Sequence, residues 1–363
     1  MSKVYKKILG ILVIVLVVST VCAFAAKGDK GTFKIGIVAP FSLDYAFLGE
    51  SIRNSILMAR DELENSRFNY EFIFEDSQND AKLDAGGAHK LIDVDKVDAI
   101  ISFGSTSGPI VTPIATESKT LHYSISVQPY ISEGLTNFIH WAPSKALNGT
   151  MAEEMKKRGI RKYGVLRSTT WEGWAIYKND LLNRAKELGL EMVTDQTFQA
   201  DTSNFRTQIA KARKAGAEIY VLYCGSPALE ILGQQLREAG DNTPLTSVGS
   251  FDLTTNKKLF EGQWYVGAAQ PNNAFITAYK KRYDKEPAVA GPNAYDIMKL
   301  IDHAISNTGS DTKPSSEQIA NELLKIRNFP GALGNLSIVD TGITMSDVDV
   351  KMIKNGEPVK VGG

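Results

Sequence analysis

Three hydroxyl residues, Ser105, Thr106 and Ser107, stand between two glycines where a strand-like apolar run over 97–103 meets the helix-like pattern that follows Pro109. A strand that enters a helix through such a turn leaves backbone N–H groups and hydroxyls directed at one place. Because the N-terminus of a helix carries partial positive charge, that place favours an anion. The turn therefore indicates half of a binding site for a small molecule, although the same residues could serve only as a helix cap.

Polar and aromatic residues also follow the other predicted strands. In open parallel sheets, ligands bind beyond the carboxyl ends of the strands, which makes these positions candidates. The candidate ligand-binding residues are Tyr45, Ser105, Thr106, Ser107, Ser126, Gln128, Arg167, Trp171, Tyr223, Phe251 and Asp252, and the wider set adds Ser42, Thr170, Cys224 and Ser226. Such a mixture of hydroxyls, amides, aromatic rings, one cation and one acid suits a small polar molecule with an apolar part. It lacks the paired acid and base that catalysis requires.

Several of these candidates have a purely structural alternative. Residues 105–107, Ser226 and Asp252 are also of the types that cap helices. Trp171 could instead be an aromatic of the core or hinge, and Arg167 could form an interdomain salt bridge.

Recognised motifs for catalysis and metal binding do not occur in the sequence. The four histidines are far apart and show no metal-ligand spacing. No Gly-x-Ser-x-Gly, Walker or His-Glu-x-x-His motif is present. With 41 basic and 41 acidic residues the formal charge is zero, and no basic stripe appears. We therefore expect no enzymatic activity, metal, cofactor or nucleic-acid partner.

The N-terminal segment 1–25 has the organisation of an export signal. Three lysines within the first seven residues precede an unbroken apolar run over 8–18, and Ala23-Phe24-Ala25 is the small-x-small pattern that signal peptidase accepts. The alternative is an uncleaved membrane anchor, since 8–26 is nearly long enough to span a bilayer. Cys22 follows a poor lipidation motif.

Cleavage after Ala25 would leave Cys224 as the one cysteine of the mature chain. An intrachain disulfide is then impossible, and burial of apolar side chains must hold the fold. We predict that the chain is exported to the periplasm.

Short apolar runs alternate with helical patterns from Phe33 onward. The predicted strands cover 33–39, 70–76, 97–103 and 121–125 in a first unit, and 162–167, 192–198, 218–223 and 245–248 in a second. Helical patterns separate them, over 48–65 and 81–92 in the first unit and over 145–158, 172–188, 204–215 and 227–239 in the second. This alternation predicts an α/β protein with two doubly wound parallel-sheet lobes.

The remaining residues are expected to return and cover the two units. They form a strand pattern over 264–268, helical patterns over 273–283, 291–307 and 316–326, and a terminal hairpin around Asn355-Gly356.

Three stretches, KIGIVAPFSLDYAFLGESIRNSILMARDEL (34–63), 75–115 and PNAYDIMKLIDHAI (292–305), resemble the periplasmic leucine/isoleucine/valine-binding protein family, as does the helix pattern AFITAYKKRYDKEP (274–287). The resemblance covers nearly all of the mature chain. It implies a type I periplasmic binding fold, in which two α/β lobes joined by three crossovers close on a ligand like a hinged trap. On this basis we expect crossovers near 139–143, 266–271 and 331–335, with lobe 1 formed by 32–140 plus 269–332 and lobe 2 by 141–268 plus 333–363.

The resemblance also implies roles for individual residues. Family members hold an amino-acid carboxylate with hydroxyls and backbone N–H groups of lobe 1, at positions that fall on Ser105, Ser126 and Gln128. An acid and a tyrosine of lobe 2 take the ammonium, at positions that fall on Phe251 or Asp252 and on Trp171.

This sequence departs from the family pattern at two places. Arg167-Ser168-Thr169 replaces the usual acidic pair, and Gln128 stands where a small hydroxyl residue is common. If Asp252 does not face the cleft, an acid without an amine fits better than an amino acid, with Arg167 or the Ser105 turn as its partner.

The expected function is that of a monomeric solute-binding protein that delivers a small ligand to an ABC permease of the membrane. A branched-chain or other apolar amino acid is the first ligand class, and a small organic or aromatic acid or amide is the second. A sensor of the same fold that docks on a membrane receptor is an alternative. A transcription repressor would need a DNA-binding headpiece before Phe33, where the export signal stands.

Overall fold

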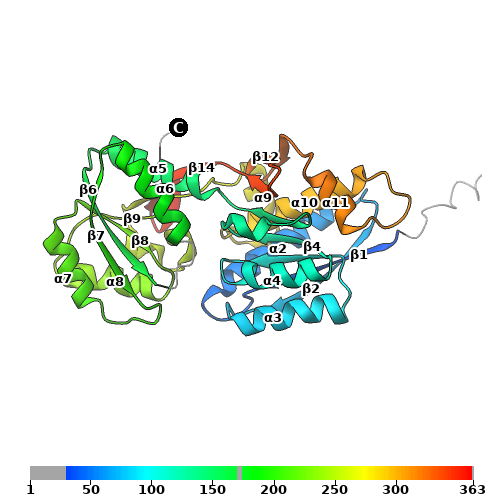
Figure 1. The fold of residues 1–363 in the computed structure, drawn as a ribbon, viewed down its shortest axis with the longest axis horizontal. Helices are drawn as coiled ribbons and strands as arrows, with labels where there is room; N and C mark the ends of the chain where they lie inside the picture. The colour runs from blue at the N-terminus through cyan, green and yellow to red at the C-terminus, as the bar shows by residue number, and fades with distance from the viewer. Residues whose placement is uncertain (1–29, 170–173, 362–363) are drawn as a thin grey trace, which may run out of the picture.

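The computed structural model describes residues 30–169 and 174–361. The predicted export signal, 1–25, and the candidates Thr170 and Trp171 lie outside the described residues. Figure 1 shows two α/β lobes side by side, connected by several segments between them. The expectation of two lobes with parallel sheets joined by three crossovers is confirmed.

Lobe 1 is built on an eight-stranded sheet with the order β11-β12-β13-β5-β4-β3-β1-β2. Its parallel part consists of β1 (Thr32–Ala39), β2 (Asn69–Asp76), β3 (Ala99–Phe103), β4 (Leu121–Ile125), β5 (Asn137–His140) and β13 (Ile343–Met345). The strands β11 (Phe329–Gly331) and β12 (Gly334–Ile338) are added in antiparallel pairing.

Helices cover both faces of this sheet. One face carries α2 (Ala46–Glu62), α10 (Gly291–Asn307) and α11 (Ser316–Leu323), with α9 (Asn273–Tyr283) packed outside them. The other face carries α3 (Ala81–His89) and α4 (Ser107–Glu117). The helix α3 continues as a π-helical turn over Lys90–Val94. Successive side chains of a strand point to opposite faces, so Phe33, Ile35 and Ile37 of β1 enter the first core and Val38 enters the second.

Lobe 2 contains a four-stranded parallel sheet and a three-stranded antiparallel sheet. The parallel sheet has the order β7-β6-β8-β9, from β6 (Lys162–Ser168), β7 (Glu191–Phe198), β8 (Ile219–Tyr223) and β9 (Leu245–Ser247). The helices α5 (Ser144–Lys157) and α6 (Trp174–Glu187) lie on one face, and α7 (Arg206–Ala215) and α8 (Ala228–Glu238) on the other. The second sheet has the order β10-β14-β15, from β10 (Trp264–Ala268), β14 (Val348–Lys354) and β15 (Glu357–Lys360).

The predicted terminal hairpin is present as β14 and β15. Asn355 and Gly356 have φ values of 55° and 78°, the left-handed conformation that a two-residue hairpin turn requires. Short helices occur in the connections, at Leu43–Tyr45, Pro129–Ser132, Ser250–Leu253 and Lys257–Phe260.

The chain passes between the lobes over 141–143, 269–272 and 346–347. The expected third crossover at 331–335, and with it the assignment of 333–345 to lobe 2, was wrong. The strand β12 extends the sheet of lobe 1, and β13 pairs with β5. Leu336 and Ile338 are completely buried in the core of lobe 1, and this burial keeps the segment there.

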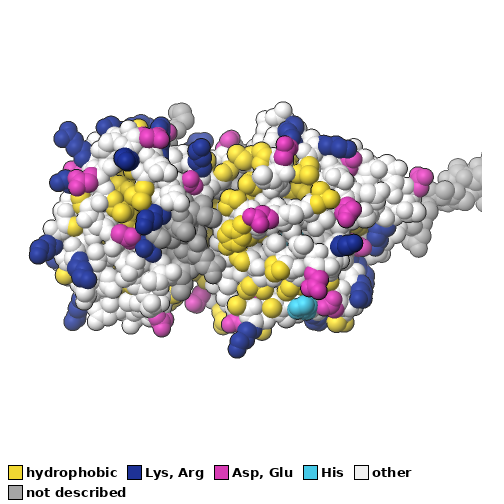
Figure 2. Space-filling view, in the orientation of Figure 1, with side chains coloured by type: hydrophobic (Ala, Val, Ile, Leu, Met, Phe, Trp, Pro, Cys, Tyr) yellow, Lys and Arg dark blue, Asp and Glu magenta, His cyan; other side chains and the backbone are white. Residues whose placement is uncertain are grey.

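Basic and acidic side chains are interspersed over the visible face of both lobes (Figure 2). Within 30–169 and 174–361, helices long and apolar enough to cross a membrane are not found.

The buried carboxyl group of Asp84 makes the stability of lobe 1 depend on pH. Asp84 lies in α3 with no exposed surface, and neither of its carboxyl oxygens has a hydrogen-bond partner among the described residues. Burial, the largest effect, and the nearby Asp80 raise the pKa of Asp84 from 3.8 to about 6, against an opposing effect of the Ser107 hydroxyl close by. The folded state therefore binds this proton more tightly than the unfolded state, and stability falls as the pH rises from about 4 to about 6.

We predict that Asp84→Asn stabilises the protein at pH 7.5, because the substitution removes a buried charge. The expected gain in the free energy of unfolding is on the order of 2 kcal/mol, and it should shrink steadily below pH 6. Urea unfolding at a series of pH values measures it. The control is Asp340→Asn, whose side chain is 97% exposed and should show no such difference. A gain that is the same at all pH values would contradict the explanation.

Candidate functional site

A cavity of about 460 Å³ lies between the two lobes. It is formed at the carboxyl ends of β3 and β4 in lobe 1 and of β6, β8 and β9 in lobe 2, the location expected for parallel sheets. Its lining is Tyr45, Leu48, Asn79, Phe103, Gly104, Ser105, Thr106, Ile125, Ser126 and Val127 from lobe 1, and Leu147, Ser168, Ala200, Cys224, Gly225, Ser226, Ala228, Val248, Gly249 and Leu253 from lobe 2. Trp141, Gly267 and Ala268 lie at the crossovers. Among the described residues, the lining contains no charged side chain.

The turn between β3 and α4 forms part of the lobe 1 wall. Gly104 has a φ of 101°, which only glycine adopts easily, and its carbonyl accepts a hydrogen bond from Gly108 N–H at 3.1 Å. This turn places Ser105 and Thr106 on the cavity wall and starts α4 beside it. Ser107 is buried and is not part of the lining. The partial positive charge of the α4 N-terminus therefore lies next to two hydroxyls of the cavity.

Ser126 and Gln128 form a connected pair after β4. Ser126 lines the cavity, and its hydroxyl donates to Gln128 Oε1 at 2.5 Å. Gln128 lies behind this wall with no exposed surface, and its Nε2 has no hydrogen-bond partner among the described residues. Gln128 thus positions the Ser126 hydroxyl rather than lining the cavity itself.

Tyr45 connects the two lobes across the cavity. Its hydroxyl donates to the carbonyl oxygen of Ser226 at 3.4 Å. Burial, the largest effect, together with the nearby Glu230 raises the pKa of Tyr45 to about 12, so the hydroxyl remains a donor at neutral pH. A second contact between the lobes is made by Lys257, whose Nζ lies 6.0 Å from the centre of the Phe47 ring.

Three candidates of lobe 2 lie outside the cavity lining. Arg167 forms a two-pronged ion pair with Asp195 of the neighbouring strand, at 2.9 and 3.2 Å, so the expected link between domains is instead a link within lobe 2. Tyr223 is buried and donates to Asn148 Oδ1 at 2.8 Å. Phe251 is stacked on Phe260 in the core, with ring centres 4.2 Å apart.

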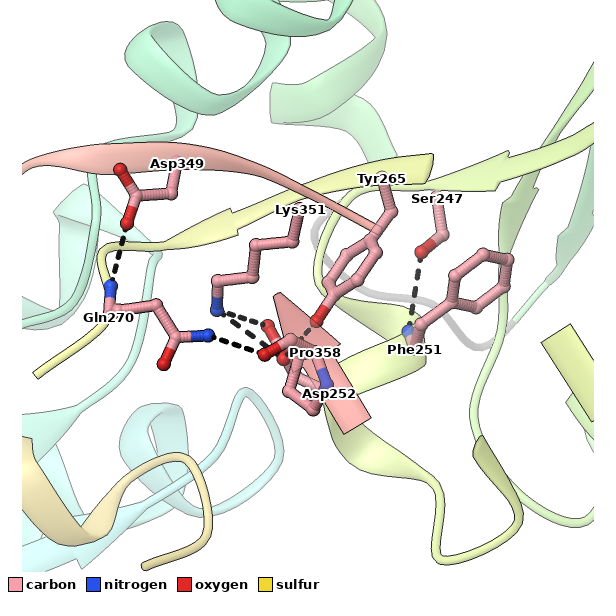
Figure 3. A network of polar contacts seen from close by, with 8 residues as sticks. All are labelled: Ser247, Phe251, Asp252, Tyr265, Gln270, Asp349, Lys351 and Pro358. Carbon is pink, nitrogen blue, oxygen red and sulfur yellow. Dashed lines mark hydrogen bonds and ion pairs between the residues drawn. The ribbon is translucent and has the colours of Figure 1, made fainter. Parts of the chain in front are cut away.

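Asp252 lies directly behind the cavity wall, where Lys351 neutralises it (Figure 3). Lys351 Nζ lies 3.2 Å from Asp252 Oδ2 and 3.4 Å from Oδ1, and the Tyr265 hydroxyl donates to Oδ1 at 2.6 Å. The side chains of Asp252 and Lys351 are only 6% and 5% exposed. Gly267 of the cavity lining lies next to this pair, and a Cβ atom at this position would lie 2.5 Å from Asp252 Oδ2.

A second carboxylate, Glu230, lies behind Ser226. Its Oε1 accepts hydrogen bonds from the hydroxyls of Ser226, at 2.5 Å, and Thr254, and the residue stands in the first turn of α8. The helix N-terminus and the two hydroxyls together stabilise the negative charge of Glu230.

Sequence reasoning missed Lys351, Glu230 and the apolar wall residues Trp141, Leu147 and Val248. The wall residues carry no chemical signal. Lys351 alternates with valine and methionine, a pattern that predicts a solvent-facing lysine, so the sequence does not indicate its burial.

The described residues include no cluster of His, Cys, Asp and Glu that could hold a metal ion. The thiol of Cys224 is buried at the cavity, and burial raises its pKa, so it remains protonated at neutral pH.

Comparison with known protein families identifies one family. The sequence profile described as periplasmic binding protein matches residues 32–357. No curated protein matches the chain significantly.

Among solved structures, the chain is similar to the leucine-binding protein LivK from Thermotoga maritima, at 24% identity, with 91% of this chain and 98% of that chain covered and a TM-score of 0.83. A solute-binding protein from R. palustris in complex with benzoate has 17% identity, coverages of 92% and 96%, and a TM-score of 0.81. LivJ from Streptococcus pneumoniae in complex with isoleucine has 19% identity, coverages of 91% and 100%, and a TM-score of 0.77.

The bond across the cavity leads to a prediction about lobe closure. Tyr45→Phe removes the hydrogen bond to Ser226, so the ratio of closed to open molecules should fall about two- to tenfold. The radius of gyration in small-angle scattering, without ligand, should therefore increase. The matched control is Tyr283→Phe, which removes a tyrosine–carbonyl bond to Asn54 within lobe 1. Identical scattering of the Tyr45 variant and the wild type would contradict a role in closure.

Proposed function

This chain belongs to the periplasmic binding protein family, and we propose that it captures a small carboxylic acid with an apolar body and without an amine, and delivers it to an ABC permease of the membrane. The observation that supports this ligand class is that the described cavity lining contains no charged side chain. Hydroxyls line one part of the wall and apolar side chains line the rest. Behind the wall, Lys351 compensates Asp252, and two hydroxyls donate to one oxygen of Glu230.

The lobe 1 wall offers a carboxylate suitable donors. Ser105 and Thr106 stand at the N-terminus of α4, where hydroxyls and the helix dipole stabilise an anion. Ser126 can contribute once its hydrogen is released from Gln128. If the Gln128 amide turns by 180°, Nε2 donates to Ser126 and the serine hydrogen becomes available to the ligand.

An amino acid meets a difficulty in the same cavity. Its carboxylate and apolar side chain would be accommodated equally well, but its ammonium would need a counter-charge. The described lining supplies none, and a buried ammonium without a partner is costly. The geometry therefore supports the acid, the second ligand class of the sequence analysis, over the amino acid.

The size and chemistry of the cavity support a ligand with one ring or a branched chain. A volume of about 460 Å³ lies at the small end of the range of roughly 300–1,000 Å³ typical of ligand sites. Leu48, Phe103, Trp141, Leu147, Val248 and Leu253 supply the apolar surface. Proteins with this fold accommodate both classes, since solved neighbours are complexes with benzoate, 4-hydroxybenzoate and isoleucine.

The proposed mechanism is a shift of population. A ligand that contacts the walls of both lobes binds the closed arrangement more tightly than the open one, and the closed form is what a permease would recognise. No bond is made or broken. Export to the periplasm and a monomeric state are parts of this proposal.

A thermal-shift screen of residues 26–363 tests the ligand class with matched pairs. These are 4-methylpentanoate against leucine and 3-phenylpropanoate against phenylalanine, each pair differing only in the amine. We expect the acids to raise Tm by several degrees, because a ligand at a hundred times its Kd stabilises by about 2.7 kcal/mol. The amino acids should have little effect. Equal or larger shifts with the amino acids would contradict the proposed class, and no shift with any compound would contradict the transport of such solutes.

A substitution at Ser105 tests the proposed position of the ligand carboxylate. Ser105→Ala should weaken binding of the acid about tenfold, because a charge-assisted hydrogen bond is lost. Ser118→Ala, at the other end of α4, should leave the Kd unchanged, since its hydroxyl bonds only within that helix end.

A further inference from the structure

We propose that Lys351 sets the charge selectivity of the cavity, by placing the protein's own ammonium against Asp252 where the ammonium of a ligand would otherwise bind. This inference rests on the proposed function and names the residue that decides between the two ligand classes.

Lys351 lies against the cavity wall and not deep in the core of lobe 2. A Cβ atom at Gly267, which lines the cavity, would lie 2.5 Å from Asp252 Oδ2 and 3.3 Å from Lys351 Nζ. Both charged groups therefore lie next to a residue of the cavity lining that has no side chain.

Three separate segments assemble the pair. Asp252 follows β9, Tyr265 belongs to β10, and Lys351 arrives on β14 immediately after the third crossover. Lys351 Nζ also lies 5.7 Å from the centre of the Tyr265 ring, whose hydroxyl donates to Asp252. Figure 3 shows the lysine side chain extending along the sheet toward Asp252. The position of the ammonium is thus fixed by packing as well as by charge.

The consequence follows from the rule that a buried charge needs compensation. With Lys351 present, the negative charge of Asp252 is already paired. A ligand ammonium therefore finds no unpaired carboxylate at this position. If the lysine charge is removed, the Asp252 carboxylate remains beside the cavity without compensation. A ligand ammonium could then occupy the space that Lys351 Nζ leaves and restore the balance.

Glu230 is the other carboxylate close to the wall, and it differs from Asp252 in two respects. The Ser226 hydroxyl stands between Glu230 and the cavity, and the α8 N-terminus compensates its charge from within lobe 2. No lysine or arginine bond to Glu230 is seen among the described contacts. Substitution of Glu230 therefore distinguishes an effect of this carboxylate on ligand binding from an effect of Asp252.

The test is the ratio of Kd values for leucine and 4-methylpentanoate, measured by calorimetry on the full mature chain. Lys351→Met should move this ratio toward leucine by tenfold or more. The control Lys360→Met removes an exposed lysine of the neighbouring strand β15, whose partner is Asp349, and should leave the ratio unchanged. In Asp252→Asn/Lys351→Met the ratio should return toward the wild-type value, because the acceptor is lost as well.

A second variant keeps the proposal testable if Lys351→Met does not fold. Asp252→Asn leaves the lysine ammonium uncompensated, so it should tighten 4-methylpentanoate binding severalfold and leave leucine no better bound. An unchanged ratio in a folded Lys351→Met protein, or weaker acid binding in Asp252→Asn, would overturn the role of Lys351. The role of Lys351 would also be overturned if Glu230→Gln, added to Lys351→Met, abolished leucine binding while Asp252→Asn, added to Lys351→Met, did not.

The proposed function can fail separately. A wild-type protein that already prefers leucine contradicts the proposed ligand class, yet a further tenfold change in Lys351→Met would still support the role of Lys351. If neither compound binds any of the variants, both proposals are wrong.

Discussion

A charge that leaves water must be compensated by another charge or by hydrogen bonds, and this constraint organises the space between the lobes. Asp252 is compensated by Lys351 and Tyr265, and Glu230 by two hydroxyls and the N-terminus of α8. Neither acid belongs to the cavity lining, which presents only hydroxyls, amides and apolar surface among the described residues. A ligand must therefore bring a charge that hydroxyls and a helix N-terminus can accept, and an anion meets that requirement.

The fold places these groups together from distant parts of the chain. Parallel strands bring their carboxyl ends to one edge of each sheet, and three crossovers set those two edges opposite each other. The first crossover supplies the wall residue Trp141 directly, and Gly267 lies in β10 just before the second. The segments on which the lobes would move thus form part of the surface that a ligand would touch. Binding and closure are coupled through these residues.

The sequence predicts most of the fold because its strands are short apolar runs between clear helical patterns. It does not reveal β5, β11, β12 or β13, since strands of three to five residues that contain polar residues, glycine or proline cannot be distinguished from loops. The misplaced third crossover follows from this, because burial of Leu336 and Ile338 in lobe 1 depends on partners far away in sequence. For the site, position at a strand end identifies the correct edge but not the direction of a side chain. Ser105, Thr106 and Ser126 reach the cavity, whereas Arg167, Tyr223 and Phe251 turn to partners within lobe 2. A change of one position along a strand is enough to reverse that direction.

The most direct test of this account is a crystal structure of residues 26–363 saturated with 4-methylpentanoate. The account predicts the carboxylate at Ser105, Thr106 and the N-terminus of α4, the aliphatic chain against Trp141, and the pair of Asp252 and Lys351 intact behind Gly267. The contradictory result would be a carboxylate bound at Lys351, with Asp252 displaced and the hydroxyls of lobe 1 facing solvent.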